Sequence, residues 1–200
     1  IRECHEAGIR VLMITGDHPV TAQAIGQMLG LRAEAPLTGV EIERLDDAAL
    51  GARIAETDVV ARAAPEHKLR LVRVLQGQGH IVAMTGDGAN DAPALQAADI
   101  GVAMGKRGTD AARQASAMVL ADDNFATIAQ AVRWGRVAYD NIKKALLFVL
   151  PTNVAQALVV AIALAAGWSL PISATQILWV NLVTAVTLAI AVAFAMPEPD

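Results

Sequence analysis

A glycine-rich stretch with the sequence TGDGANDAPAL, residues 85–95, holds two aspartates and an asparagine directly after an apolar run. Asp87 and Asp91 are four residues apart, at the predicted end of a strand and in the first turn of the following helix. Both carboxylates can therefore face one hard cation, and Mg²⁺ is usually held by one or two carboxylates together with phosphate oxygens. Asn90 can donate a hydrogen bond to a phosphate or orient a carboxylate. The stretch therefore predicts a site for Mg²⁺ and a phosphate group.

The same stretch also has a purely structural interpretation, in which Asp and Asn serve the backbone angles of a capped turn. No single turn type requires so many special residues in succession, so a turn alone explains the stretch poorly. The glycines also allow a ligand to approach the backbone closely, and the N–H groups at a helix N-terminus favour an anion. These properties favour the ligand-binding interpretation.

Two further segments carry groups that suit a phosphate. Thr15, Gly16 and Asp17 repeat the Thr-Gly-Asp sequence after an earlier apolar run, although Asp17 can also simply cap the helix that follows. Lys68 lies three residues after Pro65 at a predicted helix start, where a lysine is usually an ordinary solvated residue. As a point charge it can instead neutralise phosphoryl oxygens. We predict phosphate contacts for both segments.

Short β-branched runs and helical patterns alternate over the first two-thirds of the chain. This alternation predicts an α/β fold, in which a parallel sheet is covered by helices. Ligands of such sheets lie beyond the carboxyl ends of the strands, so the fold is expected to bring the three polar turns to one edge. The predicted strands are Ile9–Ile14, Asp58–Ala61, His80–Met84, Asp99–Val102 and Ala117–Leu120, and the predicted helices are His18–Leu29, Asp46–Glu56, Glu66–Gln76, Ala89–Ala97 and Thr109–Gln114.

The end of the chain differs in character, because no Asp, Glu, Lys or Arg occurs from Ala145 to Pro197. About 20 apolar residues are enough to cross a bilayer, so this stretch predicts a helical hairpin in a membrane. Pro151 predicts a kink, or freed backbone carbonyls, in the first span. The expected organisation is an α/β domain at 1–123, a cytoplasmic stalk helix at 124–144, transmembrane helices at 145–166 and 172–195, an extracytoplasmic turn at 167–171 and a cytoplasmic end at 196–200.

Charge and cysteine content narrow the functional class. Arg133, Arg136, Lys143 and Lys144 precede the first span, which predicts a multi-pass protein of the cell membrane with its soluble domain in the cytoplasm. The net charge of −4 gives no argument for a nucleic-acid partner. The single cysteine, Cys4, excludes an internal disulfide and fits a reducing compartment. Because the sequence lacks a starting methionine and opens inside an amphipathic pattern, we expect a fragment of a longer protein.

Polar side chains remain inside the predicted spans, among them Thr152, Asn153, Gln156, Asn181 and Thr184. Asn153 and Gln156 are three residues apart, as are Asn181 and Thr184, so each pair lies on one helix face. Hydrogen bonding between packed helices is one explanation of these residues. An ion path through the membrane is the other. The position of Asn153 and Asn181 near the middle of each span favours the ion path.

Several motifs together resemble the P-type cation-transporting ATPases. They are MITGDHPVTAQAIGQMLGL at 13–31, the turn from Pro65 to Lys68, MTGDGANDAPALQAADIGVAMG at 84–105, MVLADDNFATI at 118–128 and LWVNLVTA at 178–185. The last two are similar to the type II branch, the relatives of calcium and sodium pumps. The resemblance implies a phosphorylation domain with the haloacid-dehalogenase-like Rossmann fold, followed by the fifth and sixth transmembrane helices of a pump.

The resemblance also implies roles for individual residues. The residue that matches Asp87 binds Mg²⁺ in the family, and the one that matches Asp91 supports it. The family forms an aspartyl-phosphate from ATP and hydrolyses it while it alternates access to the ion, so ATP and Mg²⁺ are the implied cofactors. The implied partners are the transported cation, the lipid bilayer and the rest of the pump, with its nucleotide-binding and actuator domains. The residues expected at the phosphoryl group or the nucleotide phosphates are Thr15, Gly16, Asp17, Lys68 and Asn90.

The sequence departs from the family pattern in two respects. The Asp-Lys-Thr-Gly-Thr phosphorylation motif and the Thr-Gly-Glu loop do not occur in it, so we expect that the chain alone cannot turn over ATP. Calcium-pump relatives carry a Glu and an Asp where this chain has Gln156 and Ala185. A divalent ion in a low-dielectric site needs negative charge nearby. We therefore expect one ion, with a monovalent one favoured, held by neutral oxygens together with a carboxylate of the fourth helix.

The sequence also allows two other interpretations of the function. It can be a standalone, non-catalytic membrane protein derived from a pump. It can also be a membrane-anchored phosphatase of the dehalogenase group, which predicts an Asp-x-Asp motif that the sequence lacks.

Overall fold

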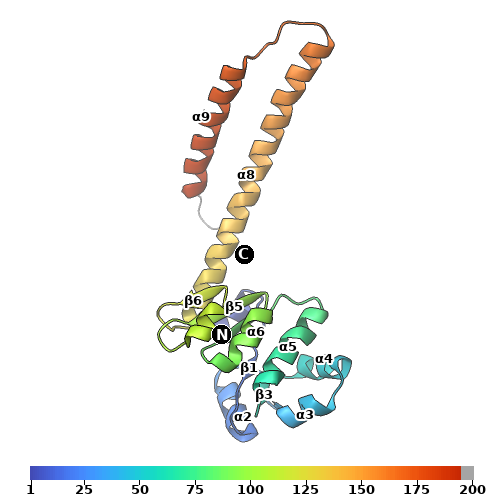
Figure 1. Ribbon diagram of the computed structural model, residues 1–200, viewed down its shortest axis with the longest axis vertical. Helices are drawn as coiled ribbons and strands as arrows, with labels where there is room; N and C mark the ends of the chain where they lie inside the picture. The colour runs from blue at the N-terminus through green and yellow to red at the C-terminus, as the bar shows by residue number, and fades with distance from the viewer. Residues whose placement is uncertain (195–200) are drawn as a thin grey trace. The chain divides into compact units, whose positions relative to one another are not determined.

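The computed structural model describes residues 1–194 and divides the chain into two compact units (Figure 1). The first unit is Ile1–Ala129 and holds all the described strands. The second unit begins at Gln130 and is helical over its described residues. The predicted cytoplasmic end at 196–200 and the last residue of the second predicted span lie outside the described residues.

Six short strands form two parallel sheets in the first unit. One sheet has the order β1-β3-β2 and the other β4-β5-β6. Within the described residues β1 and β4 are therefore edge strands that pair on one side only. The predicted parallel pairing is confirmed, but the strands are divided between two sheets. Their bounds are β1 Met13–Ile14, β2 Leu37–Thr38, β3 Val59–Ala61, β4 Ala83–Gly86, β5 Ile100–Met104 and β6 Met118–Leu120.

Helices cover these sheets, mostly where the sequence predicts them. An element pair that was not predicted, β2 and α3, lies between Leu29 and Asp46. Its local signal is a capping box, because the Thr38 side chain accepts the N–H of Glu41 while the Glu41 carboxylate accepts the N–H of Thr38. The helices of this unit are α1 Arg2–Glu6, α2 Pro19–Met28, α3 Gly39–Arg44, α4 Asp47–Glu56, α5 Pro65–Gly77, the 3₁₀ turn η1 Ala89–Asp91, α6 Ala92–Ala97 and α7 Asp110–Gln114.

The predicted strand Ile9–Ile14 is shorter than expected, because only its last two residues form β1. Arg10 is instead part of a charged clamp around Asp58, at the start of β3. Its Nε donates to Asp58 at 2.8 Å, and Arg32 donates to the same carboxylate through Nε at 2.9 Å and through its other guanidinium nitrogen at 2.8 Å. Burial alone would raise the pKa of Asp58, but the hydrogen bonds from Arg32 and Arg10 outweigh it and hold that pKa well below its usual range. The clamp joins the segments before β1 and β3.

The helix α5 packs against both sheets and so joins the two halves of the unit. Leu71 and Val74 belong to a buried cluster that includes Val60 of β3. Val72, on another face of α5, belongs to a second cluster that includes Met84 of β4. A helix that is anchored on both sides has little freedom to shift. The backbone of its first turn, which carries Lys68, is therefore held in place by both clusters.

Two long apolar helices follow, α8 at Ala126–Ala165 and α9 at Ala174–Ala193. Each has the length and composition to cross a membrane. At about 1.5 Å per residue, α8 is about 60 Å long, twice the thickness of a bilayer core. It continues through Pro151 without a break, and in that turn the Thr152 hydroxyl donates to the Phe148 carbonyl at 2.8 Å. This is the usual bond of a helical threonine to the carbonyl four residues earlier, whereas the carbonyl that Pro151 leaves without its helical donor is that of Leu147.

Candidate functional site

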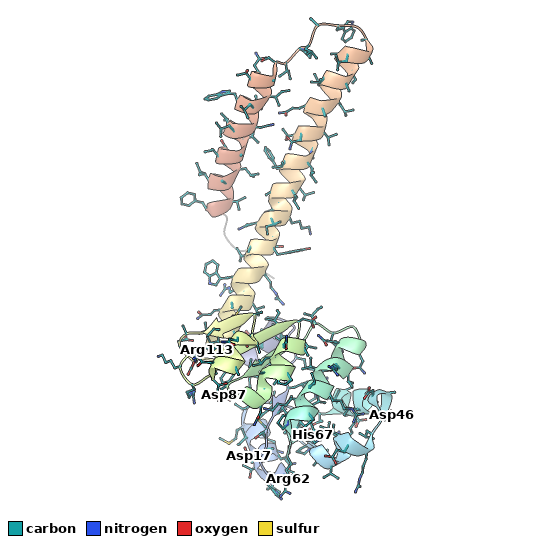
Figure 2. All side chains as sticks on the ribbon, in the orientation of Figure 1. Asp17, Asp46, Arg62, His67, Asp87 and Arg113 are labelled. Carbon is teal, nitrogen blue, oxygen red and sulfur yellow. The ribbon has the colours of Figure 1, made fainter. Side chains whose placement is uncertain are left out.

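The candidate site begins at the end of β4, where the glycine-rich stretch leaves the sheet. Asp87 is the first residue after β4, and its side chain is exposed at the surface of the first unit (Figure 2). Its backbone carbonyl accepts the N–H of Thr109 at 2.8 Å, which fixes the main chain of Asp87. The carboxylate itself makes no hydrogen bond or ion pair among the described residues. An exposed carboxylate on a fixed backbone is free to bind a cation.

Asp91 lies at the end of η1, and the structure turns it toward α5. Lys68, in the first turn of α5, donates to Asp91 Oδ1 at 2.6 Å. The two side chains are only 22% and 9% exposed, respectively, so this ion pair is shielded from water. The prediction that Asp91 and Asp87 both face one metal stays a prediction, and the local structure differs from the helix predicted from Ala89. The structure has a 3₁₀ turn there, whose residues are spaced differently around the axis.

The close packing of Asp91 against β4 depends on Gly86. A Cβ atom added to Gly86 would lie 2.7 Å from Asp91 Cβ and 2.9 Å from Asp91 Oδ2. Both distances are far inside normal van der Waals contact. The glycine of the Thr-Gly-Asp sequence is therefore a requirement of packing here, and it lets the carboxylate that holds Lys68 lie directly on the strand end.

The first Thr-Gly-Asp turn is built differently. The Thr15 hydroxyl donates to Asp17 Oδ2 at 2.8 Å, and the N–H of Arg62 donates to the Asp17 carbonyl at 3.0 Å. The turn is therefore docked on the end of β3. The alternative role of Asp17 as a helix cap is taken by His18, whose side chain accepts the N–H of Val20. A Cβ on Gly16 would meet nothing within 4 Å, so the turn has open space beside it.

The structure brings some of the predicted residues into contact and leaves others separate. Lys68 and Asp91 form an ion pair, whereas no hydrogen bond joins the Thr15–Asp17 turn to Asp87 within residues 1–194. Asn90 is exposed beside Asp91, in η1. Sequence reasoning missed Thr109, because nothing in the local pattern shows that its N–H reaches Asp87.

Sequence reasoning also missed the unusual backbone conformation of Arg62. This residue follows β3 with φ at +49°, a left-handed conformation that is unusual for a residue with a side chain (Figure 2).

The residues around Asp87 can accommodate Mg²⁺. This ion keeps several waters and needs only one or two protein carboxylates beside phosphate oxygens, which Asp87 can provide. No cluster of three or more His, Cys, Asp or Glu side chains suited to a metal occurs in the described part of the chain. A metal there would therefore take ligand oxygens in addition to aspartate carboxylates. Lys68, held by Asp91, places a positive charge at the start of α5.

The second unit, from Gln130 onward, is called the membrane unit below. It contains an open groove of about 440 Å³ beside α8. The amides of Asn153 and Gln156 both line it, in agreement with their predicted place on one helix face. Asn181 and Thr184 of α9 are half-buried and do not line this groove in the described residues. The remaining lining is apolar and consists of Ala157, Val160, Ala161, Leu164 and Ile177.

Models of known protein families match segments of both units. Residues 1–99 match the model of the haloacid dehalogenase-like hydrolases, and residues 69–132 match a second model with that description. Residues 169–200 match the C-terminal model of cation-transporting ATPases. Fold and sequence thus define a haloacid-dehalogenase-like α/β domain followed by membrane helices of a transporter.

Several proteins are similar to this chain over its whole length or nearly so. It is 47% identical over 202 residues to the cation-transporting ATPase pma1 of Synechocystis sp., covering 100% of this chain and 22% of that protein. The probable cation-transporting ATPase F of Mycobacterium tuberculosis is 50% identical, over 99% of this chain and 22% of its own length. The calcium-transporting ATPase of Bacillus subtilis is 48% identical, over 100% and 23% respectively. The chain belongs to the P-type cation-transporting ATPases, and it spans about a fifth of the length of these relatives.

Proposed function

We propose that this chain supplies the Mg²⁺ and phosphoryl site, and part of the ion path, of an ATP-driven cation pump that works through an aspartyl-phosphate. The observation that carries the proposal is the shielded Lys68–Asp91 pair beside the exposed carboxylate of Asp87. A positive charge held at a fixed point in a partly water-excluded site stabilises the charge of a transferring phosphoryl group. Membership of the pump family supports the same conclusion.

Each residue has a separate task in this proposal. Lys68 neutralises phosphoryl oxygens, and Asp91 keeps its ammonium group in place. Asp87 would hold Mg²⁺, which supplies further positive charge to the phosphoryl oxygens when bound. The N–H of Gly16 donates a hydrogen bond to the same oxygens, and the Thr15 hydroxyl does so when it turns away from Asp17, to which it donates in this structure. The amide of Asn90 is a further donor, and Asp17 lies by the nucleotide phosphates.

The aspartate that is phosphorylated must come from the rest of the pump, because the Asp-Lys-Thr-Gly-Thr motif does not occur in this sequence. The chain alone is therefore expected not to hydrolyse ATP. The pump is preferred to the phosphatase alternative because the relatives that align over the whole chain are named as cation-transporting or calcium-transporting ATPases. No observation favours the standalone, non-catalytic alternative over the pump.

The membrane unit is proposed to line the path of the cation through a cell membrane, with the first unit in the cytoplasm. The groove beside α8 exposes two neutral amides, those of Asn153 and Gln156, and no charged group. Neutral oxygens compensate a divalent ion poorly in a low-dielectric site. We therefore propose one transported ion, with a monovalent ion favoured. Asn181 and Thr184 are proposed to contribute from α9.

The central test uses the full-length pump that contains this chain, purified in detergent. Lys68→Met is expected to reduce Mg²⁺-dependent ATP hydrolysis by about 10²–10³-fold, the usual effect of removing one preorganised charge from such a site. Arg73→Met is the matched control, because it removes a positive charge from an exposed position of the same helix. Equal activity of the two variants would refute the role of Lys68. Full-length pump that accepts calcium alone would refute the proposed ion class.

A further inference from the structure

Asp123 is held by both its backbone conformation and its hydrogen bonds, and it lies outside the proposed site. It lies in the short linker between β6 and α8 and has φ at +55°, in the left-handed region that non-glycine residues rarely adopt. Its side chain is only 7% exposed. Residues held in such a conformation persist when the surrounding structure fixes them, and they often mark a functional position.

The Asp123 carboxylate fixes a loop that belongs to another part of the unit. Its two oxygens accept the N–H groups of Lys106 at 2.9 Å and of Arg107 at 2.8 Å, and the Arg107 side chain lies 3.5 Å away. The N–H of Lys106 lowers the pKa of Asp123, against a smaller opposing effect of burial, so the carboxylate is charged at neutral pH. Charge-assisted hydrogen bonds of this kind are about twice as strong as neutral ones.

The loop held by Asp123, residues 105–109, connects β5 to α7 and reaches the proposed Mg²⁺ site. At its far end the N–H of Thr109 donates to the Asp87 carbonyl at 2.8 Å. The loop turns tightly on itself and needs a glycine to do so, because a Cβ on Gly108 would lie 1.9 Å from the Met104 carbonyl oxygen. Arg113 of α7 braces it through a hydrogen bond to the Gly105 carbonyl at 2.9 Å (Figure 2). A shift of the loop at Asp123 is therefore passed on to Asp87.

The neighbouring residue, Asp122, makes contacts of a different kind. Its carboxylate accepts the Thr127 hydroxyl at 2.7 Å and the N–H of Asn124 at 3.1 Å, both at the start of α8. It makes no contact with the 105–109 loop among the described residues. The two adjacent carboxylates of the linker therefore bind different segments. Asp122 binds the start of α8, and Asp123 binds the loop that reaches the proposed site.

We propose that Asp123 is a positioning residue for the Mg²⁺ site: its carboxylate anchors the 105–109 loop, which holds the backbone of Asp87 through Thr109, to the linker that begins α8. The inference rests on the proposed function of Asp87. If Asp123 served only to shape a tight turn in the linker, replacing it would not change the hydrogen exchange of the Thr109 amide.

The test compares Asp123→Asn with Asp122→Asn in the full-length pump. Both variants remove one charge from the same linker, and Asn tolerates the left-handed conformation of residue 123. Asp123→Gly is the second variant, because it removes the carboxylate and relieves the backbone conformation at once. Hydrogen exchange by mass spectrometry of the 105–109 peptide is the first readout, and it requires no catalytic turnover.

Loss of a charge-assisted anchor is expected to speed exchange of the Lys106, Arg107 and Thr109 amides about tenfold in Asp123→Asn and Asp123→Gly, but not in Asp122→Asn. The second readout is the Mg²⁺ concentration for half-maximal ATP hydrolysis, which should rise several-fold in the Asp123 variants, with a smaller change in kcat at saturating Mg²⁺. Unchanged exchange at Thr109, or equal Mg²⁺ dependence in the Asp122 and Asp123 variants, overturns the proposal. Absence of Mg²⁺-dependent hydrolysis in the unmodified pump would instead refute the proposed function.

Discussion

The two Thr-Gly-Asp turns allow the same substitution to be made in two different environments. Gly86→Ala places a methyl group 2.7 Å from Asp91 Cβ, 2.9 Å from Asp91 Oδ2 and 3.0 Å from Asp91 Cγ. Carbon atoms in contact prefer about 3.5–4.0 Å, so the strand end or η1 must move by about 1 Å. The nearest atom is a Cβ, which cannot turn away as the end of a flexible side chain can. Gly16→Ala, in contrast, meets no atom within 4 Å.

The cost of Gly86→Ala follows from this overlap. Inserting a methyl group into a packed site costs about 1–3 kcal/mol. With a urea m value of about 2 kcal/mol per molar, the unfolding midpoint should fall by about 0.5–1.5 M. Movement of Asp91 also displaces Lys68, whose ammonium group lies 2.6 Å away. A shift of about 1 Å can reduce catalysis by about 10²-fold, so activity of the pump should fall with stability.

Pulse proteolysis in urea, applied to the 200-residue chain in detergent, measures the unfolding of the first unit without interference from the helical signal of the membrane unit. Gly16→Ala should unfold at a concentration close to that of the unmodified chain. A midpoint of Gly86→Ala within about 0.2 M of the unmodified chain would refute the packing argument, as would an equal loss of stability in both variants.

Three further outcomes are expected. Asp58→Asn should lower stability by about 2–3 kcal/mol, less than the full cost of breaking a buried pair because its arginine partners are partly exposed. Since the pKa of Asp58 is depressed in the folded state, its contribution is present above the unfolded pKa of about 3.9 and is lost as the pH falls below it, so urea midpoints should fall in acid for the unmodified chain more than for Asp58→Asn. Ser169→Cys, in a chain whose Cys4 is replaced by Ser, should react with a membrane-impermeant maleimide from outside intact cells, and labelling only after lysis would contradict the proposed topology. Gln156→Glu should strengthen divalent over monovalent transport by the full-length pump, since it adds a negative charge to the groove, and an unchanged ion preference in flux assays would count against that site.

The parts of the fold that depend on local pattern could be predicted from sequence. The helix α5 lies where Pro65 and the apolar spacing place it, and the family resemblance is confirmed by relatives over the full length of the chain. The short elements β2 and α3 were missed, because six residues with a capping box are a weak periodic signal. Periodicity also cannot show how many sheets the strands form, since that depends on which strand lies beside β1 and β4.

The candidate site was predicted by residue type but not by contact. Lys68 and Asp91 were each selected separately, whereas their pairing depends on a 3₁₀ turn that the sequence pattern does not distinguish from a helix. Thr109 acts through its main chain, which is independent of residue type, and the Asp123 carboxylate accepts from the main chain of a segment 16 and 17 residues away, so the local pattern shows neither contact. The positions of Asn153 and Gln156 followed directly from helical spacing.

The open edges of β1 and β4 have a practical consequence for work on this chain. An unpaired strand edge is a template on which the edge of another molecule can add, and this is a common origin of aggregation. In the 200 residues by themselves, each of these two strands has one side that pairs with no described strand, as do β2 and β6. Self-association should then rise with protein concentration even where every residue is native, and purification is best carried out dilute or within the longer pump.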